Sequence, residues 1–219
     1  MNRLKYNQLK GGIIMNSRVL SLSLFLVMLI SLLSGCATVD QKINLTYKPL
    51  DKPYGRNTGE VFVSRTDATS LLRNSSGAWI VGSLNNVNGV RQADLLSDVA
   101  LGEWITGALV EELKQAGFSA NYQPKLPANT ARGVVINDIN AFMAVNKGTV
   151  SSETSQELKF NVDIIINGAK IKTLAIAARD KKTLALTVSQ EEKERIMLQS
   201  LQDAIQQVMP ELIPLFGKK

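Results

Sequence analysis

Apolar and polar residues along the chain follow two different periods, which predict a mixture of strands and helices. Apolar residues recur at helical spacing from 94 to 116, and again after residue 189. Apolar runs at 60–64, 78–82, 119–123 and 134–145 are typical of strands. The pattern predicts an α+β fold, an antiparallel β-sheet with two long helices packed together on one face.

The clearest local signal is the stretch LKFNVDIIINGAKIKTLAIAA, residues 158–178. Asn167-Gly168 between two alternating runs is the preferred sequence of a type I′ β-hairpin turn. Counting outward from this turn predicts that Phe160 lies opposite Ala175 on one apolar face.

The last helix is predicted to begin at a capping box, Ser189 to Glu192, whose side chains satisfy free backbone N–H groups. Beyond Pro210 the apolar tail ELIPLFGKK either packs back on the domain or meets a partner. Two loops rich in Asn and Gly, 74–77 and 84–89, are the other candidate contact surface, because loops carry function more often than framework elements. The residues expected to contact a partner are Asn85, Asn86, Asn88, Leu212 and Phe216.

An apolar run without charge, VLSLSLFLVMLISLL, occupies residues 19–33 and follows a segment whose only charges are positive. A helix of this length rises roughly 22 Å, which is short of the ~20 residues that span a bilayer. Small residues follow at once, as a peptidase requires, so the run is typical of a secretory signal peptide. Either Met1 or Met15 is the start of translation.

Leu33-Ser34-Gly35-Cys36 resembles the bacterial lipobox, in which a small residue precedes an invariant cysteine. The resemblance implies cleavage before Cys36, a diacylglyceryl group on its sulfur and a further acyl chain, such as palmitate, on the new amino group. A thiolate suits this chemistry because it is a good nucleophile. Two or more acyl chains anchor a protein stably, at ~0.8 kcal/mol per buried CH₂.

The residue after the cysteine is Ala37, not the aspartate that retains enterobacterial lipoproteins in the inner membrane. The resemblance therefore implies the cell outer membrane, with the chain facing the periplasm and the inner membrane as the alternative. The expected organisation is a lipoprotein signal peptide at 1–35, a lipid anchor and tether at 36–59, and one periplasmic domain at 60–219. Within the tether, residues 43–47 alternate like a short strand that docks on the domain.

Charge and residue usage exclude several function classes. Four of the 25 basic residues and none of the 19 acidic residues precede Cys36, so processing removes most of the positive net charge. Without a basic patch, nucleic acid is not an expected partner. The chain has no histidine and, once Cys36 is acylated, no free thiol, which excludes Ser-His-Asp triads and cysteine nucleophiles.

No phosphate-binding or dinucleotide motif occurs, so no cofactor and no metal are expected, and the protein is not expected to be an enzyme. One alternative stays open, because a glycosidase needs only a pair of carboxylates. A hydrolase acting on peptidoglycan or glycan would draw on the acidic residues Glu103, Asp138, Glu153 and Asp163.

The order of lipobox, tether, strands, a helix ending in ELKQAGF, hairpin and capped last helix is similar to the YajG-like family of bacterial lipoproteins. That family has no established activity to carry over. Auxiliary lipoproteins of envelope lipid transporters share a comparable plan and are a further alternative. The expected function is a non-enzymatic binding or assembly role in the cell envelope, with an envelope protein or other envelope component as partner.

Overall fold

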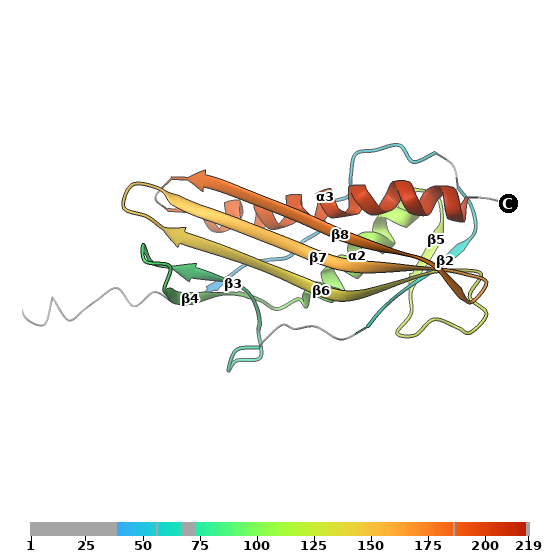
Figure 1. The fold of residues 1–219 in the computed structure, drawn as a ribbon, viewed down its shortest axis with the longest axis horizontal. Coiled ribbons are helices and arrows are strands. Elements are labelled where there is room, and N and C mark those ends of the chain that lie inside the picture. The colour runs from blue at the N-terminus through green and yellow to red at the C-terminus, as the bar shows by residue number, and fades with distance from the viewer. Residues whose placement is uncertain (1–38, 56, 67–72, 186, 218–219) are drawn as a thin grey trace, which may run out of the picture. The chain divides into compact units, whose positions relative to one another are not determined.

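The structure is a computed structural model that describes residues 39–55, 57–66, 73–185 and 187–217. The predicted signal peptide, Cys36 and Ala37 lie outside the described residues. In the described part the elements follow the order β1 (Gln41–Lys42), β2 (Glu60–Arg65), β3 (Trp79–Asn85), β4 (Arg91–Ser97), α2 (Leu101–Gln115), β5 (Ser119–Tyr122), β6 (Arg132–Lys147), β7 (Ser152–Ile166), β8 (Ala169–Leu184) and α3 (Gln190–Phe216) (Figure 1).

The strands form one mixed sheet centred on β6. One edge of β6 pairs with β7 along most of its length, and the other pairs with β2 near its start and β3 near its end. Asp138, which has a positive φ of 51°, lies in the irregular stretch between these two regions. A strand of 16 residues is thus long enough to serve two neighbours on one edge.

The predicted α+β class is confirmed, but the predicted antiparallel sheet is wrong for four pairings. β3–β4, β6–β7 and β7–β8 are antiparallel, whereas β1–β4, β2–β5, β2–β6 and β3–β6 are parallel. The apolar runs locate each strand without naming its partner. β2 and β3 follow one another in the chain, yet each pairs with β6.

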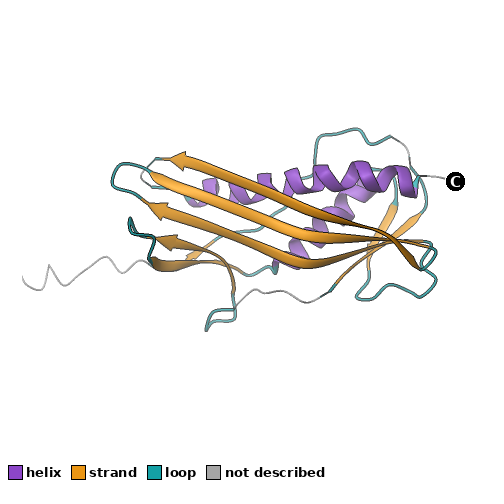
Figure 2. Ribbon diagram, viewed as in Figure 1, coloured by secondary structure: helices purple, strands orange, loops and turns teal. Residues whose placement is uncertain are grey.

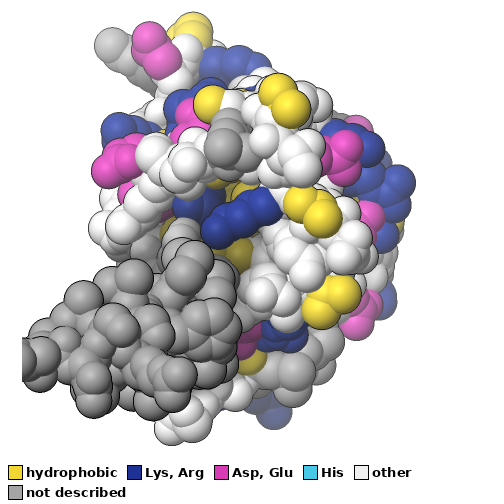
Figure 3. Space-filling view, turned by 90° about the vertical axis from the view of Figure 1, so that its left-hand side faces the viewer, with side chains coloured by type: hydrophobic (Ala, Val, Ile, Leu, Met, Phe, Trp, Pro, Cys, Tyr) yellow, Lys and Arg dark blue, Asp and Glu magenta, His cyan; other side chains and the backbone are white. Residues whose placement is uncertain are grey.

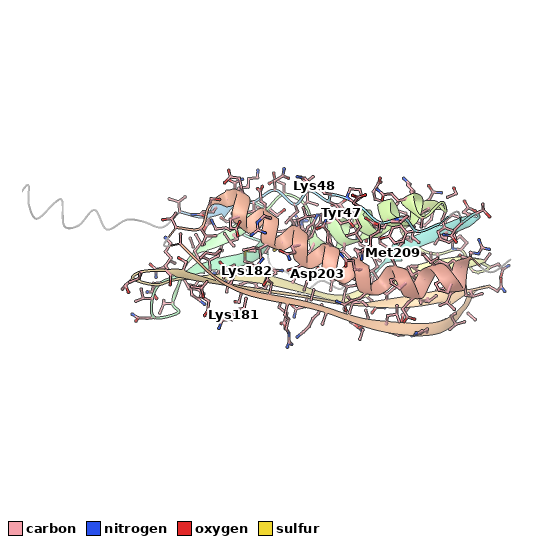
Figure 4. All side chains as sticks on the ribbon, turned by 90° about the horizontal axis from the view of Figure 1, so that it is seen from above. Tyr47, Lys48, Lys181, Lys182, Asp203 and Met209 are labelled. Carbon is pink, nitrogen blue, oxygen red and sulfur yellow. The ribbon has the colours of Figure 1, made fainter. Side chains whose placement is uncertain are left out.

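Helix α3 packs along β7 and β8, α2 packs on β2, β5 and β6, and the two helices contact each other. Figures 2 and 4 show both helices on the same side of β6, β7 and β8. Alternate residues of β7 are buried against the helices, with Leu158, Phe160 and Val162 at the centre. Among the described residues, no helix covers the opposite face of these three strands (Figure 4).

The hairpin turn is confirmed, because Asn167 and Gly168 have the positive φ values of 51° and 76° that a type I′ turn requires. The predicted register is wrong beyond the first pairs: Phe160 lies opposite Ile176, not Ala175. A bulge at Ile171 inserts one extra residue in β8. The shift turns the larger Leu174 and Ile176 toward the helices, and a slip of one residue exchanges the two faces of a strand.

Both helices differ from their predicted bounds. Residues 94–97 belong to β4 and α2 begins at Leu101. Ser189 caps α3 as predicted, since its hydroxyl accepts a hydrogen bond from the Glu192 N–H at 3.2 Å. The Glu192 carboxylate accepts from Arg195 at 2.8 Å instead of closing the predicted capping box. The helix then continues through Pro210 and Pro214 to Phe216.

Residues 41–54, predicted as part of a tether, are folded onto the domain. β1 pairs with β4, and Ile43, Leu45 and Leu50 are buried in the core. The expected docking of 43–47 is therefore confirmed, although the strand covers Gln41–Lys42 and not 43–47. Figure 4 shows Tyr47 and Lys48 beside the helices.

A buried carboxylate holds this segment in place. Glu112 of α2 is 0% exposed and accepts hydrogen bonds from the Tyr47 hydroxyl at 2.7 Å, the Leu50 N–H at 2.6 Å and the Tyr54 hydroxyl at 2.7 Å. These three donors satisfy a charge that would be costly to bury alone. The ordered domain thus begins well before residue 60.

Candidate functional site

Two of the five predicted contact residues lie inside the protein. Leu212 and Phe216 are 0% exposed, and the Phe216 ring meets Phe118 edge-on at 6.2 Å between centroids. The apolar tail therefore packs back on the domain, which was one of its two expected roles. Leu212 and Phe216 are corrected as surface contacts, because their apolar area completes the core between α2 and α3.

The three predicted asparagines lie at the turn between β3 and β4, but two of them bond within the protein. The Asn85 amide donates to Asn146 at 2.8 Å. The Asn86 side-chain oxygen accepts the N–H groups of Asn88 at 2.9 Å and Val90 at 3.0 Å. Only the exposed side chain of Asn88 extends to solvent with no side-chain hydrogen bond to the described residues.

The loop at 74–77 has the same construction. The Asn74 side-chain oxygen accepts the N–H groups of Ser76 at 3.1 Å and Ala78 at 2.9 Å. In each loop the glycine three residues after the asparagine, Gly77 or Gly89, has a positive φ. The asparagines of both loops therefore shape turns, which is a structural role.

The four carboxylates of the hydrolase alternative are not gathered in a cleft. Glu103 is exposed on α2, Asp138 accepts from Asn161 at 2.7 Å, and Glu153 pairs with Lys181 at 3.0 Å. Asp163 accepts from Asn137 at 3.0 Å and from Thr173. None of them lines any of the five hollows described for this domain.

A groove of about 450 Å³ crosses β6, β7 and β8 on the face without helices. Two cross-strand rows form it: Phe142, Glu157 and Arg179 in one, and Ala144, Ser155 and Lys181 in the next. The small side chains of Ala144 and Ser155 leave a depression beside the Phe142 ring, which is 39% exposed. Figure 4 shows Lys181 pointing away from α3, toward this face.

Charged pairs border the groove. Glu157 accepts from Lys159 at 2.8 Å and from Arg179 at 2.6 Å, and these hydrogen bonds lower the pKa of its carboxyl. A glycosidase acid needs a raised pKa to stay protonated, so Glu157 is poorly suited to that role. An exposed aromatic ring among fixed charges is instead suited to holding a partner by apolar contact and ion pairing.

A second candidate region, here called the loop-bearing end, consists of the turn 86–90, the loop 148–151 and residues 187–189 before α3. It contains a cavity of about 250 Å³ lined in part by Lys147, Val188 and Lys193. Figure 3 faces this end and shows basic side chains in a hollow with separate apolar side chains around it.

Lys193 is 3% exposed and donates to Gln41 at 2.9 Å and to the carbonyl of Val188 at 2.7 Å. Both acceptors are neutral. Burial lowers the pKa of the Lys193 ammonium, and the charge of Lys147 lowers it further.

Sequence reasoning missed the groove, and of the loop-bearing end it predicted only the turn between β3 and β4. Phe142 was counted only as part of an apolar run, and its exposure depends on which face of β6 the helices cover. Lys193 lies four residues before Met197 on the buried side of α3, but a lysine is seldom buried, so its residue type argues against the position that the spacing predicts. Exact alternation along β6 would have indicated that Phe142 faces away from Ala141 and Met143.

Within the described part of the chain, neither helix is long and apolar enough to cross a bilayer. Among the same residues, no three acidic, cysteine or histidine side chains come together as a metal site would require.

No family model matches the chain, and no curated protein sequence matches it significantly. Solved structures similar to it include protein XCC0632 from Xanthomonas campestris, of family model DUF330, at 10% identity and a TM-score of 0.47, covering 80% of this chain and 95% of that one. A minor lipoprotein from Acinetobacter baumannii has 13% identity and a TM-score of 0.39, covering 71% and 91%.

The uncharacterized lipoprotein B from Nitrosomonas europaea has 11% identity and a TM-score of 0.40, covering 78% and 92%. The structures similar to this chain thus include bacterial lipoproteins. With such identities and TM-scores below 0.5, these similarities establish neither a shared family nor a shared activity.

Proposed function

We propose that this chain is a lipid-anchored envelope protein of YajG-like type, held at the outer membrane through Cys36, with a non-enzymatic binding role in the periplasm. The proposed contact surface is the groove across β6, β7 and β8. The observation that carries the binding role is the exposed Phe142 ring beside a depression with charged borders, on a face without helices.

The anchor is tested by replacing the acylated thiol. Cys36→Ser should abolish incorporation of radiolabelled palmitate and leave the precursor uncleaved. Cell fractionation then reports whether the protein has lost its membrane attachment. A variant that is processed and membrane-bound like the parent would show that the lipobox interpretation is wrong.

The binding surface is tested by photocrosslinking in living cells. A photoreactive amino acid in place of Phe142 should capture a discrete partner, identified by mass spectrometry. The matched control places the same amino acid at Glu103, which is exposed on α2 on the opposite side of the sheet. The partner captured at Phe142 should be lost in an Arg179→Glu/Lys181→Glu background, because both lysine and arginine charges border the groove.

Phe142 and Glu103 are exposed, so placing the photoreactive amino acid at either position should change the free energy of unfolding by no more than about 0.5 kcal/mol. Circular dichroism of the charge-reversed variant shows whether it is folded like the parent. The groove would not be the contact surface if the same partner were captured equally from Phe142 and Glu103. The same holds if capture at Phe142 were unchanged in the charge-reversed background.

A further inference from the structure

We infer that the loop-bearing end rests on the phospholipid surface, with the valines of its two loops in contact with the lipid interface. The inference rests on the proposed anchor at Cys36. It goes beyond that anchor by assigning a second, non-covalent membrane contact to the folded domain and by fixing which end faces the bilayer.

Large apolar side chains are exposed unevenly over the domain. Among the described residues, the four most exposed large apolar side chains are Val39, Val87, Val90 and Val150, at 55% to 85%, and they belong to the residues just before β1 or to loops of this end. The less exposed Ile171, Phe142 and Tyr122 lie elsewhere on the domain. Scattered exposed valines need no explanation, but their concentration at one end does.

Strand registers place these valines together. β3 runs parallel to β6 with Asn85 opposite Asn146, so the turn holding Val87 and the loop holding Val150 leave the sheet side by side. Figure 1 shows both connections at the same end, opposite the C-terminus.

The chain also leads toward this end. β1 is parallel to β4 with Gln41 opposite Leu95, and Asp40 accepts the Asp94 N–H at 2.9 Å. The chain before Gln41 therefore runs alongside β4 toward Arg91, the first residue of β4, and toward the turn that precedes it.

The length of the connection limits where the domain can lie. Four residues lie between Cys36 and Gln41, and the five steps of the chain that join the two span at most about 18 Å. The turn before Arg91 lies roughly 13 Å ahead of Leu95, at about 3.3 Å per residue. Since Gln41 is held in the sheet, a lipid on Cys36 brings this turn to the interface. The exposed Lys147 at the same end is available to lipid phosphates.

The test uses the full, lipid-modified chain reconstituted into vesicles of phosphatidylethanolamine and phosphatidylglycerol. Acylated Cys36 has no thiol, so one introduced cysteine carries a polarity-sensitive fluorophore at Val87→Cys or Val150→Cys. The matched control is Ile171→Cys, 50% exposed at the β7–β8 hairpin, the opposite end of the same sheet.

We expect a blue-shifted emission and at least twofold quenching by acyl-chain-brominated lipid at positions 87 and 150, and neither at 171. In a Val87→Asp background the quenching at position 150 should fall at least by half, while circular dichroism stays unchanged.

Vesicle-bound protein with no quenching at 87 and 150 would overturn this inference and leave the anchor standing. A blue-shifted emission without quenching counts as this outcome, because protein alone can shield a label from water. Quenching at 171 equal to that at 150 would also overturn it. Protein that does not float with vesicles, and whose Cys36 reacts with the fluorophore, would overturn the anchor and this inference together.

Discussion

At the scale of single residues, Glu112 shows how one buried charge orders a whole segment. Three donors from residues 47–54 converge on its carboxylate, which lies on a buried turn of α2. The neighbouring Glu111 is exposed and offers a matched comparison. The difference between the two lies in the side of the helix, not in the residue type.

Glu112→Ala should lower the free energy of unfolding by about 2–3 kcal/mol, because it leaves the buried Leu50 N–H and two tyrosine hydroxyls without their acceptor. Urea unfolding measures the loss, and hydrogen exchange at Leu50 should accelerate. Glu111→Ala should stay within about 0.5 kcal/mol of the parent. Equal effects of the two substitutions would contradict the role given to Glu112.

The same contact predicts a loss of stability at high pH. Burial and the hydrogen bond to Glu112 raise the pKa of Tyr47 and of Tyr54 above the ordinary value of about 10. Above about pH 10 the unfolded chain releases protons that the folded chain keeps, so the free energy of unfolding falls as pH rises. Below that pH the stabilisation is fully present.

Urea unfolding between about pH 8 and about pH 11 should show this fall, and it should be shallower in a Tyr47→Phe/Tyr54→Phe variant. Absorbance of the phenolate in the folded protein gives an independent measurement. An unchanged slope in the double variant would mean that other groups cause the fall.

At the scale of elements, turns and bulges decide what each strand presents. The bulge at Ile171 turns Leu174 and Ile176 inward, and the Asn86 side chain closes the turn between β3 and β4. Both features act through backbone geometry. Asn86 and Asn88 differ in role for this reason, because only the Asn86 side chain bonds the backbone of the turn.

Asn86→Ala should lower the free energy of unfolding by about 1 kcal/mol, because the N–H groups of Asn88 and Val90 lose the side-chain oxygen that accepts from them and are left to bond water. Asn88→Ala should cost no more than about 0.5 kcal/mol, because its exposed side chain bonds no described residue. Chemical denaturation of the two single variants distinguishes them. Matching values would show that the Asn86 oxygen does not stabilise the turn.

At the scale of the whole molecule, the anchor, the groove and the loop-bearing end form one proposal. In this proposal, an acylated Cys36 and the valines of the loop-bearing end face the lipid, and the groove across β6, β7 and β8 is left free for a periplasmic partner. The proposed orientation of the domain rests on the short connection between Cys36 and β1.

The proposed location at the outer membrane makes a prediction about Ala37. Ala37→Asp should move the protein from the outer to the inner membrane fraction in an enterobacterial host, because the lipobox resemblance implies that aspartate there retains lipoproteins. Density-gradient separation of membranes measures the change. A protein that stays in its original fraction would show that sorting ignores this position.

The sequence by itself determined the α+β class, the Asn167-Gly168 hairpin and the cap at Ser189. These depend on local period and turn chemistry, which a short stretch of chain contains in full. The same kind of local pattern predicts the lipobox at Cys36, which lies outside the described residues.

Only the tertiary structure decided the parallel pairings around β6, the register beyond the bulge at Ile171 and the burial of Leu212 and Phe216. It also placed Glu112 inside and Phe142 outside. Each of these features depends on which distant segment pairs with a strand edge or covers an apolar surface. Packing and buried hydrogen bonds between residues far apart in the chain decide this, so a local sequence pattern cannot predict it.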